Sequence, residues 1–418
     1  MVVLEIPNLL APFHKLLATT QSLFAIEFDA TFLPNRRNQA TLNAKIKPHA
    51  TVVHIPAIFN EVDSMPSVGV PKPLNLRAGE LVQVRSEAEI LATLDSNGRL
   101  GAMPFMPEML QYCGKQFRVF KRAHKSCDTI SKTGGRKMEG MVHLTDLYCD
   151  GAAHGGCQAG CLIYWKEEWL FRVNPSPFRR FFSSIKNAFQ PSIEKQNSAP
   201  PVLSREDFLL TTQIQPTGAK PEETTYTCQV TEILNASKPL PWWDFRQYFE
   251  DLSSGNVSLR EVASVLLYYL VKHTLEIKIG YRAQLWFHNR VQKLLGFTPF
   301  PFRAGTQTKT PTEDLNLQPG ELVQVKSNQE ILDTLDARSK NKGLLFDLEE
   351  VPYCGGQYKV RNRVDRIINE KNGKMMQLPG ASVILHGVVC KALYSDCRIF
   401  CPRSVFCYWR EIWLKRVD

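Results

Sequence analysis

The stretch Gly79–Asp95, GELVQVRSEAEILATLD, returns as GELVQVKSNQEILDTLD at Gly320–Asp336, with 13 of 17 positions identical. Two further pairs of matching blocks follow in the same order and at nearly the same spacing: Tyr112–Val119 with Tyr353–Val360, and Tyr164–Val173 with Tyr408–Val417. Chance does not produce three matching blocks in one order. The chain therefore carries a unit of about 95 residues twice, and a unit of that length can bury its own core.

Each copy has the pattern of short strands joined by turns. LVQV alternates as a strand does, and so does QFRVFKR or QYKVRNR after the Cys-Gly turn. Ser86 with Glu89, and Ser327 with Glu330, form S-x-x-E capping boxes that predict a short helix. VHLTDLYC or VILHGVVC, and finally IYWKEEWLFRV or FCYWREIWLKRV, predict two more strands. Short strands, glycine turns and one short helix in this length are typical of a small β-barrel.

The opening G-E-x-V-x-V, the central Y-C-G turn and the closing W-L-x-R-V of each copy resemble an elaborated SH3-like barrel. The whole chain resembles an uncharacterised bacterial tandem-repeat family marked by CDGAAHGGCQAGC at Cys149–Cys161 and CPRSVFCYWREIW at Cys401–Trp413. Because no activity is established for that family, the resemblance implies fold and architecture only. The expected fold class is α+β and multidomain, with two small SH3-like β-barrels flanking a mainly helical insert.

The expected domain organisation follows from the two copies. Repeat 1 spans residues 74–173 and repeat 2 spans residues 315–418, while the N-terminal segment 1–73 matches nothing else in the chain and stays unassigned. Between the repeats the sequence predicts three parts: a Pro- and Ser-rich linker at 174–205, a mainly helical insert at 206–300 and a polar linker at 301–314.

The sequence between the repeats also predicts local structure. Thr225–Leu234 alternates like a strand, and Pro241–Leu252 has the pattern of a short helix. Ser258 and Glu261 form another capping box ahead of a longer helix, and a second helix is expected over Tyr281–Leu295. In the linker, FRRFFSSIKNAF has one apolar helical face beside basic residues. It predicts docking against the rest of the protein, or a weak peripheral contact with an anionic membrane.

Composition excludes several classes of protein. Hydrophobic residues make up 44% and charged residues 22%, which is the ordinary globular mix and excludes wholesale disorder and collagen-like chains. No apolar run approaches the ~18 residues of a membrane span, and the first residues lack the features of a signal peptide. We therefore expect a cytoplasmic protein without a transmembrane segment. The net charge of +10 leaves a nucleic-acid partner open without showing one.

The eleven cysteines are the residues most informative about chemistry. Their number is odd and they cluster near the end of each copy, which indicates ligands more than a disulfide framework. Three thiolates with one imidazole, or four thiolates, satisfy tetrahedral zinc, so we expect up to one structural zinc ion per repeat. The candidate ligands are Cys149, His154, Cys157 and Cys161 in repeat 1, and Cys390, Cys397, Cys401 and Cys407 in repeat 2.

Roles without zinc also stay open for the cysteines. The spacing lacks the common C-x2-C pairs, so cysteines that are simply buried or disulfide-bonded are an equal alternative, and an iron–sulfur cluster is a further one. Cys127 has no counterpart in repeat 2, where Ile368 occupies the corresponding position, so it is not expected to belong to the shared unit. Cys228 lies alone in a predicted strand and is expected in a core.

One segment of repeat 1 is strongly basic. Between Gly114 and Lys137 the chain carries eight basic residues against one acid, with Phe117 and Phe120 interleaved. Such a hairpin can follow a phosphate backbone while its rings stack on bases. The candidate nucleic-acid contacts are Lys115, Arg118, Lys121, Arg122 and Lys125. The plainer interpretation is a solvated hairpin whose charges protect an exposed sheet edge.

Catalysis finds little support, because the sequence has no G-x-S-x-G, no Walker loop, no dinucleotide fingerprint and no H-E-x-x-H. The leading hypothesis is a non-enzymatic binding or scaffold protein with a protein or peptide partner. The candidate binding surface consists of aromatic residues, at least half of which are expected in the core: Tyr112, Trp165, Trp169, Tyr353, Trp409 and Trp413. The alternatives are a nucleic-acid-binding protein that uses the basic hairpin, and a metal-dependent enzyme or redox protein that uses the cysteine loops.

Overall fold

The computed structural model describes residues 74–131, 134–173, 203–211, 213–214, 224–276, 305–394 and 398–417, with single helical positions at 286, 290 and 294. Several predictions fall outside the described residues: segment 1–73, the FRRFFSSIKNAF stretch, most of the helix expected over Tyr281–Leu295, and Cys397. Residues Gly69–Asp418 form one compact unit. No helix in the described part of the chain is long and apolar enough to cross a membrane.

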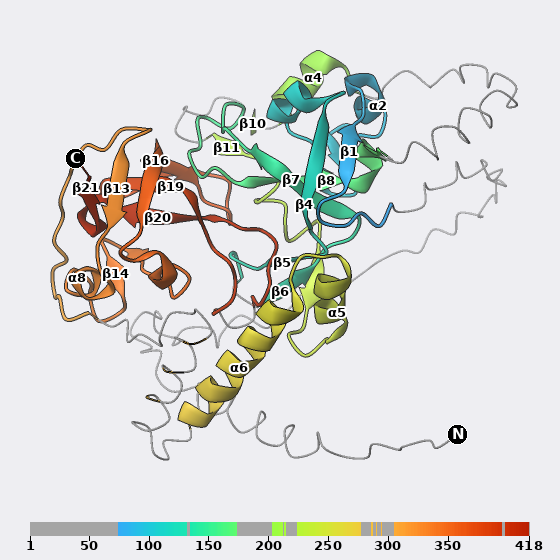
Figure 1. The fold of residues 1–418 in the computed structure, drawn as a ribbon. Coiled ribbons are helices and arrows are strands. Elements are labelled where there is room, and N and C mark those ends of the chain that lie inside the picture. The colour runs from blue at the N-terminus through green and yellow to red at the C-terminus, as the bar shows by residue number, and fades with distance from the viewer. Residues whose placement is uncertain are drawn as a thin grey trace, which may run out of the picture. The chain divides into compact units, whose positions relative to one another are not determined.

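Repeat 1 folds into a five-stranded antiparallel sheet that curls into a half-barrel, in the strand order β8-β7-β4-β1-β9 (Figure 1). Its strands are β1 (Leu81–Val84), β4 (Gln116–Arg122), β7 (Met141–Tyr148), β8 (Leu162–Lys166) and β9 (Leu170–Arg172). The first and last strands of the repeat are neighbours, because β1 pairs with both β4 and β9. The alternation expected for LVQV is confirmed, since Val82 and Val84 are buried while Leu81 and Gln83 are half-exposed.

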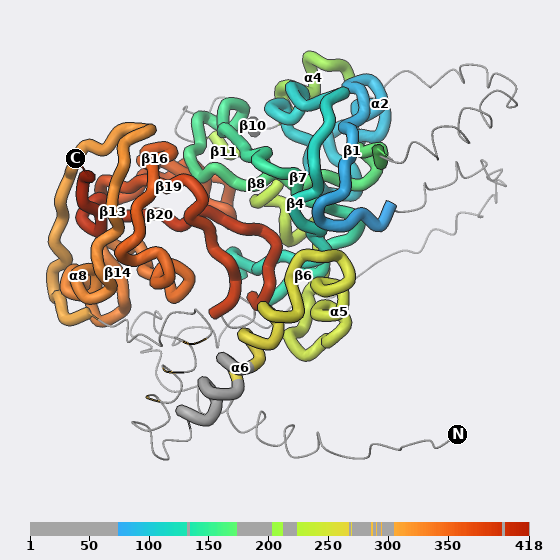
Figure 2. Tube along the Cα trace, viewed as in Figure 1, coloured from blue at the N-terminus to red at the C-terminus, as the bar shows by residue number. Residues whose placement is uncertain are grey.

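Repeat 2, orange to red in Figure 2, forms a second sheet with the same strand order, β20-β19-β16-β13-β21. Its strands are β13 (Leu322–Val325), β16 (Gln357–Arg363), β19 (Ser382–Val389), β20 (Phe406–Arg410) and β21 (Leu414–Arg416). The register also agrees, since Leu81 lies opposite Arg118 as Leu322 lies opposite Lys359. The two blocks of similar sequence thus adopt one topology, within a mixed fold that has few helices.

The last predicted strand of each repeat is interrupted. A 3₁₀ turn at Glu167–Trp169 separates β8 from β9, and one at Glu411–Trp413 separates β20 from β21. The glutamate of each turn points inward: Glu167 accepts the backbone N–H groups of Asn75 and Leu76, both at 2.9 Å. The expectation of one continuous strand is therefore wrong, because a buried carboxylate binds the chain entering β1 and bends the strand at that point.

The capping boxes are confirmed. Ser86 and Ser327 begin the short helices α2 (Glu87–Leu91) and α8 (Asn328–Leu332), and in each case the side chain of the glutamate at the third position accepts the backbone N–H of the serine. The two repeats also contain smaller elements that correspond to each other. The hairpins are β2 (Arg99–Leu100) with β3 (Met103–Pro104), β14 (Lys340–Asn341) with β15 (Leu344–Leu345), β5 (Lys125–Cys127) with β6 (Gly135–Lys137), and β17 (Arg366–Ile368) with β18 (Met375–Gln377). The 3₁₀ helices are Pro107–Tyr112 and Val351–Tyr353.

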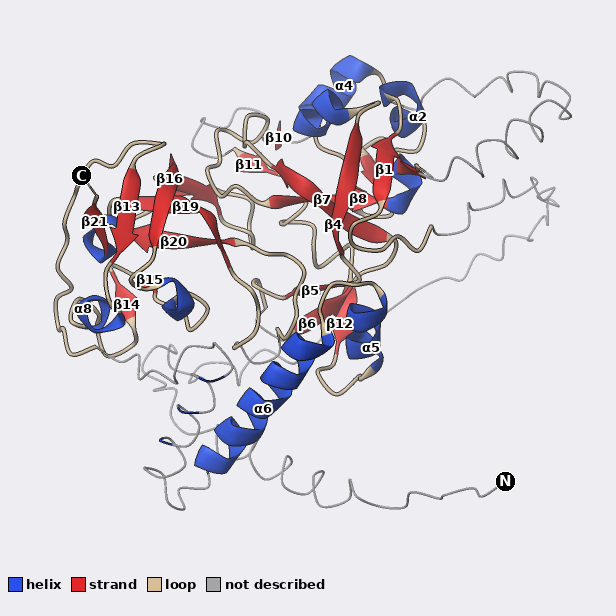
Figure 3. Cartoon of the chain, in the orientation of Figure 1, coloured by secondary structure: helices blue, strands red, loops and turns tan. Residues whose placement is uncertain are grey.

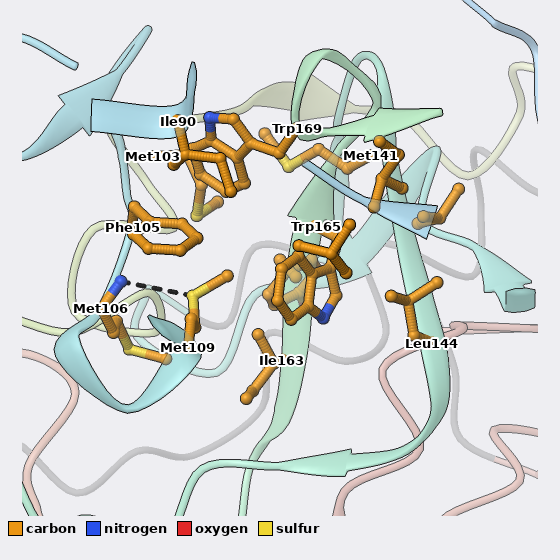
Figure 4. Packing of buried hydrophobic residues seen from close by; sticks show 14 of the residues in the cluster. Ile90, Met103, Phe105, Met106, Met109, Met141, Leu144, Ile163, Trp165 and Trp169 are labelled. Atoms are coloured by element: carbon orange, nitrogen blue, oxygen red, sulfur yellow. Dashed lines mark hydrogen bonds between the residues drawn. The ribbon is translucent and has the colours of Figure 1, made fainter. Parts of the chain in front are cut away.

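Each repeat has its own hydrophobic core, as the sequence predicts. In repeat 1, Trp165 and Trp169 pack edge-to-face on Phe105, with ring centroids 6.2 and 5.1 Å apart (Figure 4). In repeat 2, Trp409 and Trp413 pack in the same way around Phe346. Two smaller apolar clusters contain residues of both repeats, among them Cys127 with Cys401 and Tyr148 with Phe406.

The segment between the repeats, which the sequence predicts as a separate insert, packs against repeat 1 and adds side chains to its core (Figure 3). Its described elements are α4 (Arg205–Leu210), β10 (Gln213–Ile214), β11 (Thr225–Tyr226), β12 (Lys238–Leu240), α5 (Arg246–Ser253) and α6 (Leu259–Glu276). Phe208 and Ile233 are fully buried in the core of repeat 1. The strand expected over Thr225–Leu234 is wrong beyond Tyr226, because turns follow there and carry the apolar side chains into that core. The helices expected at Pro241–Leu252 and after Ser258 are confirmed.

Candidate metal centre

Three side chains of types that bind metal ions meet just after strand β7. Oε1 of Glu108 lies 3.0 Å from Nδ1 of His154 and accepts the thiol hydrogen of Cys149 at 3.0 Å. One ligand atom from each of the three residues lies within 4.8 Å of the other two. His154 is fully buried and Glu108 is 8% exposed, so the cluster is largely shielded from water.

Three local structures position these side chains. Glu108 lies in the first turn of the 3₁₀ helix Pro107–Tyr112, and Cys149 directly follows β7. His154 lies in the loop between β7 and β8, where Gly151 has a φ of +72° and a Cβ at that position would lie 1.9 Å from the carbonyl oxygen of Cys157. Only glycine fits there, because the loop folds back on itself at that residue. The glycine-rich sequence thus brings His154 inward, as a loop enclosing an ion requires.

A small cavity adjoins the cluster. Its volume is about 30 Å³, enough for one or two water-sized occupants. Cysteines from distant parts of the chain line it: Cys149, Cys157, Cys161 and Cys228. His154 lines it as well, so every ligand predicted for repeat 1 lies at this cavity. In the described part of the chain, however, the group of acidic, thiol and imidazole ligand atoms within 4.8 Å of one another includes neither Cys157 nor Cys161.

The electrostatics of the cluster reflect burial and hydrogen bonding. Burial alone would raise the pKa of Glu108, but the interactions with His154 and Cys149 outweigh it and hold the pKa below its usual value. Burial and the neighbouring Glu108 carboxylate raise the pKa of the Cys149 thiol well above its ordinary value. Oε2 of Glu108 and Nε2 of His154 are buried and have no hydrogen-bond partner among the described residues. The carboxylate and the imidazole of the cluster therefore each keep an atom that can still bind a ligand, and the thiol lies beside them.

The corresponding position of repeat 2 is built differently. Glu349 and Cys390 correspond to Glu108 and Cys149, but Oε1 of Glu349 accepts the backbone N–H of Tyr394 at 2.7 Å. The sequence has no histidine between Cys390 and Cys407. Cys407 is buried in the core of repeat 2, whereas Cys401 contacts Cys127 of repeat 1. Cys390 packs against the same cluster as Cys401, whereas Cys407 belongs to the core of repeat 2, so the described residues of repeat 2 do not bring all three cysteines to one site.

The tryptophans proposed as a binding surface are core residues. Trp165, Trp169, Trp409 and Trp413 are fully buried, and Tyr353 is 6% exposed. This burial corrects the expectation for these residues, because the inward faces of both half-barrels need large side chains to fill them. Of the six aromatic candidates, Tyr112 is half-buried and packs edge-on against Phe117.

The basic hairpin is not a uniform cationic surface. Lys125 is buried, and its Nζ lies 2.6 Å from Oδ2 of Asp251 in helix α5. Arg122 pairs with Glu250 of the same helix at 3.2 Å. The expectation that Lys125 contacts nucleic acid is thereby corrected, because helix α5 covers that lysine and supplies its counter-ion. Of the other candidates, Lys115 and Arg118 are exposed, and Lys121 is half-buried.

Sequence reasoning missed Glu108 and placed Cys228 only in a core. A usable signal for Glu108 existed, because an acid recurs at the corresponding position 349 of repeat 2. For Cys228 no signal existed, since its approach to the cavity depends on how the segment between the repeats folds back. Comparison with known protein families, with curated proteins and with solved structures gives no match to this chain.

Proposed function

We propose that this chain is a non-enzymatic scaffold protein in which a structural zinc ion, bound by Glu108, Cys149 and His154, holds repeat 1 together. The observation that carries the proposal is the buried approach of a carboxylate, a thiol and an imidazole to within 4.8 Å of one another. Leaving a buried polar atom without a partner costs roughly 1–3 kcal/mol. Oε2 of Glu108 and Nε2 of His154 are among such atoms, and a bound cation would offset that cost.

The chemistry of the ligands favours zinc. A thiolate, an imidazole nitrogen and a carboxylate oxygen together suit a borderline-soft divalent ion, and hard ions such as Mg²⁺ prefer oxygen alone. The proposed fourth ligand is one of the thiols that line the adjoining cavity, those of Cys157, Cys161 and Cys228, whose sulfur atoms lie outside the 4.8 Å group and would have to move toward the ion. The small volume of the cavity supports a structural role over a catalytic one, because a catalytic zinc ion keeps a position open for substrate.

The scaffold part of the proposal treats each repeat as an SH3-like module of the uncharacterised bacterial tandem-repeat family. The common strand order and register of the two sheets support it. A protein or peptide remains the proposed partner class. It is supported by three large aromatic side chains before and in helix α5 that are 60 to 72% exposed: Trp243, Phe245 and Phe249. Aromatic side chains are enriched at the centres of protein interfaces.

The test is the zinc content of the purified full chain, kept reduced throughout. We expect about one zinc ion per chain, and its loss from Cys149→Ser and from His154→Gln, because each change removes a ligand. Replacing zinc by Co²⁺ should give a thiolate-to-cobalt absorption band that is absent in Cys149→Ser. Removal of the metal by a chelator should lower the unfolding temperature of the wild-type protein.

The matched control is Cys390→Ser, which changes the corresponding cysteine of repeat 2. It should keep the zinc content of the wild type, since the carboxylate beside Cys390 already accepts a backbone N–H. Reduced wild-type protein that contains no zinc and takes up none would overturn the proposal. So would an unchanged zinc content in both Cys149→Ser and His154→Gln.

A further inference from the structure

Two cysteines that are far apart in the sequence meet where repeat 1 contacts repeat 2. Cys127 ends strand β5 of repeat 1, and Cys401 lies in the loop between β19 and β20 of repeat 2. The backbone N–H of Cys127 donates to Sγ of Cys401 at 3.2 Å. Both residues are buried, at 5 and 6% exposure, and they share an apolar cluster with Ala392 and the half-buried Cys390.

A corresponding contact exists with the roles of the two repeats exchanged. The backbone N–H of Ile368 in repeat 2 donates to Sγ of Cys157 in repeat 1 at 3.4 Å. Ile368 corresponds to Cys127, and Cys157 corresponds to Cys401 when the sequences are matched back from the final Tyr-Trp block. Each repeat thus presents a loop cysteine to a strand end of the other. Two thiols meet in only one of these two contacts. The strand end of repeat 1 is Cys127, which faces Cys401, whereas the strand end of repeat 2 is Ile368, which faces Cys157.

A buried arginine completes the surroundings of the thiol pair. Nη1 of Arg403 lies 4.0 Å from Sγ of Cys127 and donates to Oγ1 of Thr129 at 3.0 Å. Its Nη2 lies 2.5 Å from Oε1 of Glu370. Arg403 is 2% exposed, so its charge acts on the sulfur with little screening by water. A cation placed beside a thiol favours the thiolate, which is the reactive form.

The pKa values of the two thiols shift in opposite directions, and the lower one belongs to Cys127, the thiol beside Arg403. A hydrogen bond from Cys401, followed by the charges of Arg403 and Arg398, lowers the pKa of Cys127 although burial opposes the shift. The same hydrogen bond, together with burial, raises the pKa of Cys401. A thiolate next to a protonated thiol is the arrangement that suits an attacking sulfur and a resolving sulfur.

From this geometry we propose that Cys127 and Cys401 are an oxidation site, at which a hydroperoxide closes a disulfide that links the two repeats covalently. The Cys127 thiolate attacks one oxygen of hydrogen peroxide, the O–O bond breaks, and the departing hydroxide takes up a proton to become water. Cys127 is then a sulfenic acid. The sulfur of Cys401 attacks it, the S–S bond forms, the S–O bond breaks, and the hydroxyl leaves with the Cys401 thiol proton as a second water. Two thiols are oxidised and one peroxide is reduced.

The sequence makes the test unambiguous, because trypsin releases each cysteine in a peptide that contains no other. Cys127 lies in Ser126–Lys132 and Cys401 lies in Ile399–Arg403. The reduced full chain is treated with hydrogen peroxide, remaining thiols are alkylated under denaturing conditions, and the non-reduced digest is analysed by mass spectrometry. We expect loss of both single peptides and a linked species two hydrogen masses below their sum. Dithiothreitol should restore the single peptides.

Variants separate this link from other oxidation. Cys127→Ala and Cys401→Ala should each abolish the linked species, whereas Cys390→Ser should retain it although Cys390 lies in the same cluster. Because the wild-type digest is read directly, the proposal stays testable if a variant fails to fold. Two outcomes would overturn it: peroxide-treated wild type in which both cysteines remain alkylatable, or in which Cys127 reaches sulfinic acid or pairs with Cys390 without a link to Cys401.

Discussion

Asp251→Ala should lower the free energy of unfolding by roughly 3–5 kcal/mol, because it leaves the buried ammonium group of Lys125 without its counter-ion. Asp251 is fully buried in helix α5, with Nζ of Lys125 at 2.6 Å and Nε2 of His124 at 3.2 Å. Both partners belong to the strand β5 region of repeat 1 and are at most 5% exposed. Without the carboxylate, the Lys125 ammonium keeps the uncharged Oε1 of Gln247 at 3.4 Å and the rings of Tyr248 and Phe400, whose centroids lie 5.0 and 5.8 Å from Nζ. Urea unfolding followed by tryptophan fluorescence measures the loss.

Two comparison variants show that the lost charge is responsible. Asp251→Asn keeps the size of the side chain and should lose most of the same stability. Asp244→Ala removes an acid just before the same helix, where Asp244 pairs with an Arg246 side chain that is 90% exposed. An ion pair with so exposed an arginine contributes little, although Asp244 also accepts the backbone N–H of Arg246 at 3.2 Å, so the unfolding midpoint of Asp244→Ala should fall far less than that of Asp251→Ala. An Asp251→Ala midpoint as high as that of Asp244→Ala would show that the buried ion pair does not stabilise the docking of α5.

His143→Ile should make the protein markedly less sensitive to acid. His143 is fully buried in strand β7, its Nδ1 lies 2.9 Å from the carbonyl oxygen of Ile163, and its ring centroid lies 4.4 Å from that of Tyr164. Burial lowers the pKa of His143 to about 3, and the nearby positive charges of Lys121 and Arg403 act in the same direction. Repeat 2 carries isoleucine, Ile384, at the corresponding buried position, so the replacement already has a precedent in this fold.

The direction of the effect follows from proton binding. Between pH 6.5 and about 3 the unfolded chain protonates this histidine while the folded chain does not, so stability falls as the pH falls through that window. The slope reaches about 1.4 kcal/mol per pH unit, and the accumulated loss at pH 5 is roughly 2 kcal/mol. At pH 7.5 the histidine is neutral in both states and contributes no such term.

The measurement is the free energy of unfolding of wild type and His143→Ile at several pH values between 7.5 and 4. The difference between the two proteins should shift in favour of the variant by roughly 2 kcal/mol from pH 7.5 to pH 5. His386→Gln is the control, because His386 is exposed on the corresponding strand β19 and should leave the profile of the wild type unchanged. Parallel profiles for wild type and His143→Ile would contradict a neutral buried imidazole.

Local sequence predicted local structure well. The capping boxes at Ser86, Ser327 and Ser258 each begin a helix, because one hydroxyl and one carboxylate three residues later are enough to satisfy the first N–H groups. The alternation of LVQV, repeated at β1 and β13, gave both the strand and its buried side. Such features depend on neighbours within a few residues, and these are visible in the sequence.

What the sequence did not show depends on contacts between distant segments. The two tryptophans of YWKEEW, and of YWREIW, lie four positions apart, and this spacing alone does not say whether they face the barrel interior or the solvent. The sequence separates Cys127 from the shared unit because it lacks a cysteine counterpart in repeat 2, yet in the structure Cys127 contacts Cys401, 274 residues away in the other repeat. The recurring acid marks Glu108, but its role depends on Cys149 and His154, which only the folded chain brings next to it.

The reciprocal contacts between the repeats have a consequence for assembly. Cys157 meets the strand end at Ile368, and Cys401 meets the strand end at Cys127, so the two halves recognise each other through complementary surfaces. The same surfaces are present when repeat 1 of one molecule meets repeat 2 of another. Exchange of halves between two molecules would reproduce both of these contacts, so a domain-swapped dimer is the expected alternative assembly at high concentration.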